Sequence, residues 1–263
     1  SFVPAIDWHL RYRTDRETYL LVSELIGYLS EATVPFVIGN DDGRMKRLPG
    51  GEDIRVDYNA SLVWDDGRFQ EEIYRKVHLV PFTENFPYEK SLPGIYKLLR
   101  AADTHFWEKG DRFSVFTAAG VSFSTPICFE DTFGYISREF VRNGAEVIVN
   151  LTNDSWSGSV PSEMQHMAMA VFRAVENRRT VVRSTNGGIT CYITPEGKIP
   201  EILEPFTEGY IVPSVPVYTG KQTVYTKYGD WFGSGAVAAA GALFIAGIGL
   251  RIFGRKRNRI SGT

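Results

Sequence analysis

The sequence has few residues that could build a metal centre or a disulfide framework. Its 263 residues include only two cysteines, Cys128 and Cys191, which are too few and too far apart for a zinc ribbon. The four histidines show no metal-ligand spacing: they are His9, His78, His105 and His166. The pattern therefore argues against a metal-dependent enzyme.

A strong excess of charge of either sign is also absent. The formal net charge is -2, which gives no reason to expect nucleic acid as a partner. The hydrophobic content of 43% and the charged content of 23% are those of an ordinary globular protein. The length suffices for one large α/β domain or two small ones.

The first residues lack the features of a secretory signal. Residues 1–5 contain neither a basic segment nor an apolar one, and the chain does not begin with methionine. This pattern predicts an N-terminus that has been processed or truncated.

Charged residues are missing between Trp231 and Leu250. A helix of this length spans about 30 Å, the thickness of a bilayer core. Two aromatic residues stand at its start, and a tail with five basic residues and no acidic one follows: Arg251, Arg255, Lys256, Arg257 and Arg259. A buried core helix is the alternative, but such a helix would not normally end in a basic tail.

We therefore predict three parts of the chain. Residues 1–230 form the folded domain, 231–253 a transmembrane helix, and 254–263 a basic tail. Because basic residues favour the cytoplasmic side, we expect the tail in the cytoplasm and the domain on the opposite face of the membrane.

Apolar periodicity and turn signals predict a mixed sheet covered by helices. Strands occur as hairpins, around Asp66-Gly67 and Ala119-Gly120, and also alternate with helices. Helices are expected at residues 15–32, 95–99, 133–143 and 163–178, and strands at 34–39, 60–64, 69–74, 112–117, 121–127, 146–151, 180–184, 189–193 and 210–212. The fold class is therefore an α/β or α+β sandwich.

Cys128 stands where an apolar strand runs into a turn before a helix. Backbone N–H groups at such a turn can lower the pKa of a thiol and bind an oxyanion. Glu130 and Asp131 follow and can accept protons or cap the helix. A buried structural cysteine next to a capping acid explains the same local pattern. Cys191, between Ile189 and Ile193, has the setting of a core residue.

Lys76 ends a predicted strand and precedes an apolar run broken by Pro81. A lysine placed there can point inward and stabilise both a thiolate and a developing oxyanion. Most lysines are solvated, so this segment alone decides nothing. His78 in the same run is expected to serve packing or hydrogen bonding.

Together these segments resemble the nitrilase (carbon–nitrogen hydrolase) superfamily, through the run K-x-H-L-V-P-F-x-E at 76–84 and I-C-F-E at 127–130. Further motifs resemble its membrane-bound branch, the apolipoprotein N-acyltransferases. They are N-L-T-N-D-S-W at 150–156, Q-H at 165–166, R-A-V-E-N-R at 173–178, R-S-T-N-G-G-I at 183–189 and T-K-Y-G-D at 226–230. The resemblance covers nearly the whole chain and implies a nitrilase-like α-β-β-α sandwich with mixed sheets.

The resemblance also implies roles for individual residues. Cys128 matches the nucleophile and Lys76 the oxyanion-stabilising lysine, while Glu84 and Glu130 match supporting acids. Asn153 and Trp156 match a loop that borders the acyl pocket, although Trp156 could equally be a core residue. Arg173 and Glu176 are expected to form a structural pair.

One part of the family pattern is missing from this sequence. The family's general base is a glutamate in a W-P-E-S/T segment, and Ser1-Phe2-Val3-Pro4 resembles the residues directly after that glutamate. The expectation is therefore that the base, its strand and a multi-span membrane region lie upstream of residue 1, and that this fragment is incomplete.

The implied reaction is ping-pong acyl transfer without a cofactor. A membrane phospholipid would donate an acyl chain to Cys128, and the N-terminal amine of a diacylglyceryl apolipoprotein would accept it. The implied location is the bacterial cytoplasmic (inner) membrane, with the domain on the periplasmic side. Two alternatives share these residues: a membrane-tethered amidase that hydrolyses a small amide, and an inactive remnant without the catalytic glutamate.

Overall fold

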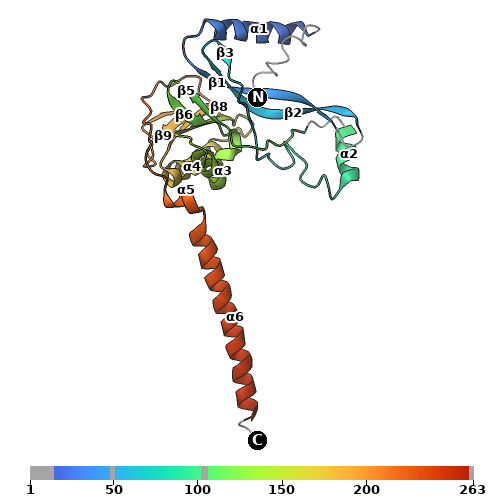
Figure 1. Ribbon diagram of the computed structural model, residues 1–263, viewed down its shortest axis with the longest axis vertical. Helices are drawn as coiled ribbons and strands as arrows, with labels where there is room; N and C mark the ends of the chain where they lie inside the picture. The colour runs from blue at the N-terminus through green and yellow to red at the C-terminus, as the bar shows by residue number, and fades with distance from the viewer. Residues whose placement is uncertain (1–14, 48–50, 102–105, 261–263) are drawn as a thin grey trace.

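The computed structural model describes residues 15–47, 51–101 and 106–260, and two sheets form within these ranges (Figure 1). The first sheet contains strands β1 (Phe36–Arg47), β2 (Asp53–Asp65), β3 (Arg68–Phe69) and β4 (Tyr74–Arg75). Strand β2 pairs antiparallel with each of the other three. Helix α1 (Arg16–Glu31) precedes this sheet, and helix α2 (Pro93–Ala101) follows it.

The second sheet is mixed, as the sequence predicts. Its strands lie in the order β10-β9-β8-β7-β6-β5. They are β5 (Val115–Ala118), β6 (Val121–Ser124), β7 (Val147–Asn153), β8 (Thr180–Asn186), β9 (Thr190–Ile193) and β10 (Glu201–Leu203). The central strands β6, β7 and β8 are parallel, and the outer pairs are antiparallel.

Two helices make the crossovers between the parallel strands. Helix α3 (Gly134–Arg142) joins β6 to β7, and α4 (Val160–Asn177) joins β7 to β8. Strands that run parallel need such crossovers, so the alternation of helices and strands in the sequence has a direct cause. The fold class is the expected α/β one, with one antiparallel sheet, one mixed sheet and helices packed against them.

Both predicted hairpin turns are confirmed. Asp66 and Gly67 have φ values of 50° and 75° between β2 and β3, and Ala119 and Gly120 have 50° and 76° between β5 and β6. Two consecutive residues with positive φ match the twist of an antiparallel hairpin, which is why glycine is favoured at the second position.

Several strand predictions need correction. The strand expected at 69–74 is two short ones, β3 and β4, with no strand at 70–73, and β2 begins at Asp53 where a strand is expected only at 60–64. Strand β1 is longer than residues 34–39, because its polar half, 40–47, also pairs with β2. The strand expected at 210–212 is wrong: this segment is irregular, and Tyr210 and Val212 are 85% and 83% exposed. The apolar residues of this segment suggest a strand. The strand at this edge of the sheet is instead β10, whose Glu201 pairs with Tyr192 of β9.

The core has two parts. One lies where the two sheets meet α3 and includes Val63, Tyr74, Phe123 and Phe140. The other packs α4 on β7, β8 and β9, and fully buried Cys191 belongs to it, which confirms the expected core position.

A short helix connects this core to the C-terminal helix. Helix α5 (Val224–Tyr228) is followed by α6 (Trp231–Ile260), which leaves the domain as a single rod (Figure 1). The Thr226 hydroxyl donates to the Asn177 side chain at 2.9 Å, and Arg138 donates to the Lys227 carbonyl at 3.0 Å. These bonds attach α5, which directly precedes α6, to α4 and α3.

Helix α6 is long and apolar enough to cross a membrane. Its segment Trp231–Gly249 has a mean hydropathy of 1.7, and none of it is buried against the rest of the chain. Within the part of the chain that the structure describes, this segment is therefore not a core helix.

Candidate active site

Cys128 occupies a strained position after β6. It begins the short 3-10 helix η3 (Cys128–Thr132) with a φ of 52°, a value that is uncommon for residues other than glycine. A backbone bridge between Ile127 and Leu151 fixes the preceding residue against β7. Strain of this kind persists only where the surroundings hold it, and it is frequent at functional sites.

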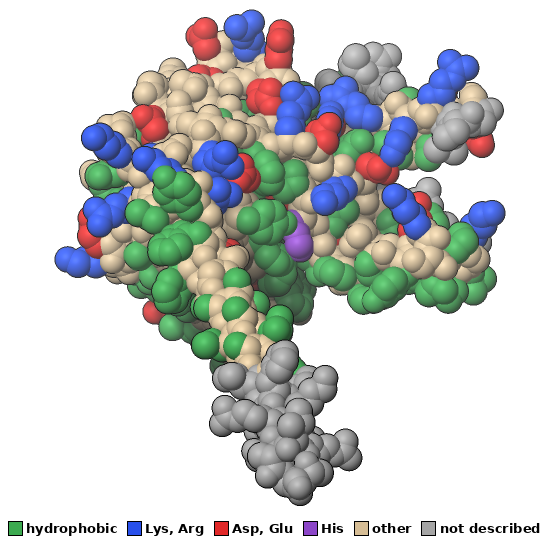
Figure 2. All heavy atoms as spheres, turned by 60° about the horizontal axis from the view of Figure 1, so that its bottom comes forward, with side chains coloured by type: hydrophobic (Ala, Val, Ile, Leu, Met, Phe, Trp, Pro, Cys, Tyr) green, Lys and Arg blue, Asp and Glu red, His purple; other side chains and the backbone are tan. Residues whose placement is uncertain are grey.

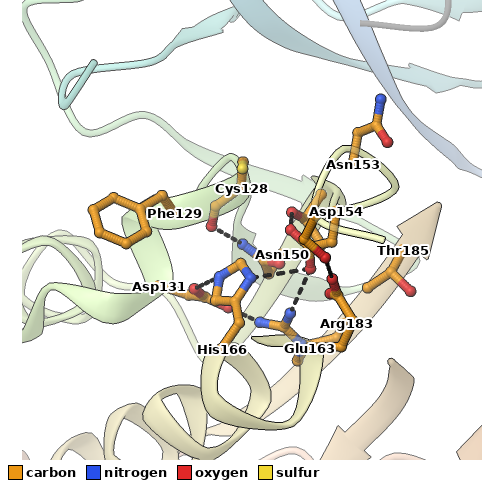
Figure 3. Close-up of polar contacts among 12 residues, drawn as sticks. Cys128, Phe129, Asp131, Asn150, Asn153, Asp154, Glu163, His166, Arg183 and Thr185 are labelled. Atoms are coloured by element: carbon orange, nitrogen blue, oxygen red, sulfur yellow. Dashed lines mark hydrogen bonds and ion pairs between the residues drawn. The ribbon is translucent and has the colours of Figure 1, made fainter. Parts of the chain in front are cut away.

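The side chain of Asn150 on β7 fixes the turn at Cys128 by hydrogen bonds. Its side-chain NH₂ donates to the carbonyl oxygens of Pro126 at 3.2 Å and Cys128 at 3.0 Å, and the side chain is buried (Figure 3). The Pro126 carbonyl also accepts from the Leu151 N–H. The asparagine therefore ties β7 to both sides of the turn and helps to satisfy its buried acceptors.

Glu130 is fully buried and connects η3 to the first sheet. One carboxylate oxygen accepts from the backbone N–H groups of Val77 at 2.8 Å and His78 at 2.9 Å. The other accepts from the Ile127 N–H at 2.8 Å and the Tyr74 hydroxyl at 2.7 Å. Burial raises the pKa of Glu130, but all four neighbours donate, which favours the ionised carboxylate.

Lys76 points inward, as one interpretation of its segment predicts. It follows β4 directly and is 1% exposed. Its Nζ donates to both Glu84 carboxylate oxygens, at 2.8 and 2.7 Å. Glu84 also accepts from the Asn59 side chain and the Val80 N–H. The lysine charge is thus paired and held in a fixed place.

A cavity of about 610 Å³ lies beside Cys128, and neither Lys76 nor Glu130 is among its lining residues. Cys128 and Glu84 line it, and so do Asn153 and Trp156. Trp156 is 79% exposed, so the alternative of core packing is wrong. The Asn153 side-chain oxygen accepts from Ser155 and Asn186, which fixes its orientation at the end of β7. Substrate binding by these two residues stays a prediction.

The surroundings of Cys128 raise the pKa of its thiol. Burial raises its pKa, while the nearby Lys76 ammonium and a hydrogen bond to Thr152 act in the opposite direction. The turn acts in the expected direction, because the Phe129 N–H lowers this pKa, but desolvation outweighs it and the net shift is upward. Attack by Cys128 accordingly requires removal of its proton.

Two other expectations about side chains are confirmed. Arg173 pairs with Glu176 at 2.8 Å and donates to the Thr132 carbonyl. The His78 ring lies 3.9 Å from the Phe133 ring, centroid to centroid, and hydrogen-bonds the Tyr135 hydroxyl. Both residues thus make structural contacts.

A buried charge cluster was not predicted. His166 on α4 bonds Asp131 at 2.8 Å through Nε2 and Asp154 at 3.0 Å through Nδ1 (Figure 3). Arg183 on β8 pairs with both carboxylates and is fully buried. Burial lowers the His166 pKa, but the hydrogen bonds to the two carboxylates outweigh it and raise the pKa to about 9.

The sequence offered only a weak signal for this cluster. Arg183 follows Val181 and Val182 in the strand Thr180–Asn186, and a charge in the middle of a buried strand implies a buried partner. The partners come from η3, from α4 and from the segment after β7, and only the fold brings these together. No group of three or more His, Cys, Asp or Glu side chains suited to a metal ion occurs among the described residues.

The profile of the carbon–nitrogen hydrolase family matches residues 25–224. The chain belongs to this family. It is 45% identical over 251 residues to "Apolipoprotein N-acyltransferase 1" of Treponema pallidum, covering 94% of this chain and 46% of that protein. It is 47% identical over 245 residues to the protein of the same name from Treponema denticola, covering 89% and 45%. The chain thus spans about half the length of the curated relatives it matches.

A solved amidase from Nesterenkonia sp. is 18% identical, with a TM-score of 0.47 over 72% of this chain and 64% of its own. Membership of the carbon–nitrogen hydrolase family rests on the match along the sequence, which includes Lys76, Glu84 and Cys128.

Removal of the lysine charge should make the Cys128 thiol harder to ionise. Because Lys76 lowers the thiol pKa, Lys76→Ala should shift the pH dependence of Cys128 alkylation by iodoacetamide to higher pH. Peptide mass spectrometry separates this site from Cys191. The exposed Lys90→Ala variant is the control and should keep the original profile. An unchanged profile in Lys76→Ala would contradict the electrostatic role.

The charge on His166 should make stability depend on pH. Its folded pKa of about 9 lies above the ordinary 6.5, so its stabilising effect is complete below pH 6.5 and disappears as the pH rises through 9. The full effect is on the order of 3 kcal/mol. The thermal midpoint in detergent should fall between pH 6.5 and 9.5, and His166→Gln should lack this part of the decrease. An equal decrease of the thermal midpoint in the unchanged protein and in His166→Gln would show that other titrating groups cause it.

Proposed function

We propose that this chain is the catalytic part of a membrane-tethered N-acyltransferase that matures lipoproteins. Its acyl donor is a membrane phospholipid, and its acceptor is the N-terminal amine of a diacylglyceryl-modified apolipoprotein. The names of the relatives, the cysteine that lines a cavity and the buried lysine whose charge acts on its thiol support this assignment.

The observation that carries the proposal is the apolar face from which α6 leaves the domain. Figure 2 shows hydrophobic side chains gathered around the start of this helix. On α4, which is bonded to α5, the side chains of Met164, Phe172 and Val175 are 45%, 62% and 48% exposed. Exposed apolar side chains on a domain that carries a candidate span favour contact with lipid, so the domain is suited to a substrate that resides in the bilayer.

The first half of the reaction forms an acyl-enzyme. The Cys128 thiolate attacks the phospholipid ester carbonyl, and the Lys76 ammonium stabilises the negative oxygen of the tetrahedral intermediate. The ester C–O bond then breaks, the lysolipid leaves with a proton, and a thioester remains on Cys128. Glu84 fixes the lysine in place for this role.

The second half transfers the acyl chain to an amine. The acceptor amine attacks the thioester, the C–S bond breaks, and an amide forms while the thiol is regenerated. Water would hydrolyse the same thioester, so the site must exclude it. Asn153 and Trp156 border the acyl pocket in this account. An amidase would instead use water at this step.

The proposal includes an orientation in the membrane. Residues 231–253 span the bacterial cytoplasmic (inner) membrane, and the basic tail, 254–263, lies in the cytoplasm. The domain of residues 1–230 then lies on the periplasmic side. No cofactor takes part.

An acyl-thioester on Cys128 tests the function. The protein, expressed at its full natural length, should gain the mass of one acyl chain after incubation with phospholipid vesicles. Hydroxylamine should remove this mass, and a diacylated lipopeptide should discharge it as an amide. Cys191→Ala should behave like the unchanged protein, whereas Cys128→Ala should not be labelled. Discharge at equal rates with and without lipopeptide would favour a hydrolase.

Reporter fusions test the orientation. A fusion after Thr263 should be active only with a cytoplasmic reporter, and a fusion after Tyr228 only with a periplasmic one. The same reporter working at both positions would show that 231–253 does not span the membrane.

A further inference from the structure

A line of polar side chains leads from the cavity beside Cys128 to the buried charge cluster. Thr152 lines the same cavity as Cys128, where its hydroxyl lowers the thiol pKa, and it donates to Asp154 Oδ1 at 2.9 Å. The other oxygen of Asp154 faces His166 Nδ1 at 3.0 Å. Thr152 and Asp154 are both buried. The thiol is thus only two side chains away from the imidazole ring.

His166 is the charged centre of this line. Both ring nitrogens face carboxylates, and an ionised carboxylate only accepts, so both nitrogens carry hydrogen. The groups that face the ring are Asp131 on η3, Asp154 after β7, Arg183 on β8 and Glu163 on its own helix. The raised pKa of His166, about 9, agrees with an imidazolium. With both nitrogens occupied, His166 is unsuited to act as the base for Cys128.

The Thr152 hydroxyl has a single hydrogen and two competing acceptors. The first is the Asp154 carboxylate, and the second is the Cys128 sulfur when it is ionised. Positive charge next to the other oxygen of Asp154 weakens the attraction between this carboxylate and the Thr152 hydroxyl hydrogen. His166 at 3.0 Å and Arg183 at 3.4 Å supply that charge.

We infer that His166 is a positioning residue that acts through Asp154 and Thr152 to direct the Thr152 hydroxyl to the Cys128 thiolate. The imidazolium satisfies Asp154, and Thr152 then donates to sulfur as the thiol loses its proton. The inference rests on the proposed function only in taking Cys128 as the nucleophile. His166 itself touches no reacting atom in this account.

The test is the pH dependence of Cys128 alkylation by iodoacetamide, which requires no substrate. His166→Gln keeps a hydrogen-bonding side chain but loses the charge. It should raise the apparent thiol pKa by about one unit, so that alkylation at pH 7 becomes about tenfold slower. Thr152→Val should give a similar shift, whereas Thr152→Ser keeps the hydroxyl and should restore the original profile.

Combination of the variants separates coupling from general damage. If the signal passes through Thr152, the double variant His166→Gln/Thr152→Val should show no larger shift than Thr152→Val alone. Glu176→Gln is the control: it removes a partner of Arg173 on the same helix, away from the cavity, and should leave the profile unchanged. Near-ultraviolet circular dichroism checks that each variant is folded.

Two results would overturn the inference. One is an unchanged thiol profile in folded His166→Gln, and the other is a double variant whose shift equals the sum of the single shifts. The acyl-enzyme experiment gives an independent answer. A chain that forms no thioester but shows the coupled shifts would refute the acyltransferase proposal and leave the role of His166 intact.

Discussion

The buried carboxylate of Glu130 is the contact on which the geometry of the site depends. It receives two backbone N–H groups from the segment after β4 and one from the turn before Cys128, together with the Tyr74 hydroxyl. The segment after β4 begins with Lys76, so one carboxylate holds the lysine strand and the cysteine turn at a fixed separation. Its loss would leave buried donors unpaired, at a cost of about 1–3 kcal/mol for each.

The residue after Glu130, Asp131, connects the same turn to the second sheet and to α4. Asp131 is also fully buried, but it bonds His166 on α4 and Arg183 on β8. Two consecutive acids of η3, Glu130 and Asp131, thus connect the turn at Cys128 to the first sheet and to α4 and β8. The strained φ of Cys128 is tolerated because both sides of its turn are held.

The sequence predicts most of the second sheet, since its hairpin turns, crossover helices and apolar strands follow local rules. It also predicts Cys128, Lys76, Glu84 and Glu130 as candidates, but only the combined pattern distinguishes them from ordinary buried or solvated residues. The thiol pKa and the His166 cluster could not be predicted, because both depend on burial and on partners distant in sequence. The strand prediction at 210–212 fails for the same reason, because the exposure of these residues to solvent cannot be derived from their apolar side chains.

The central claim is that Glu130 brings the Lys76 charge to bear on the Cys128 sulfur. A double-mutant cycle on the apparent pKa of the Cys128 thiol tests it, with Lys76→Ala measured in the unchanged protein and in the near-isosteric Glu130→Gln variant. The account predicts that Lys76→Ala raises this pKa in the first background and changes it far less in the second, because the lysine segment is no longer held. An equal rise in both backgrounds, with both proteins folded, would contradict it.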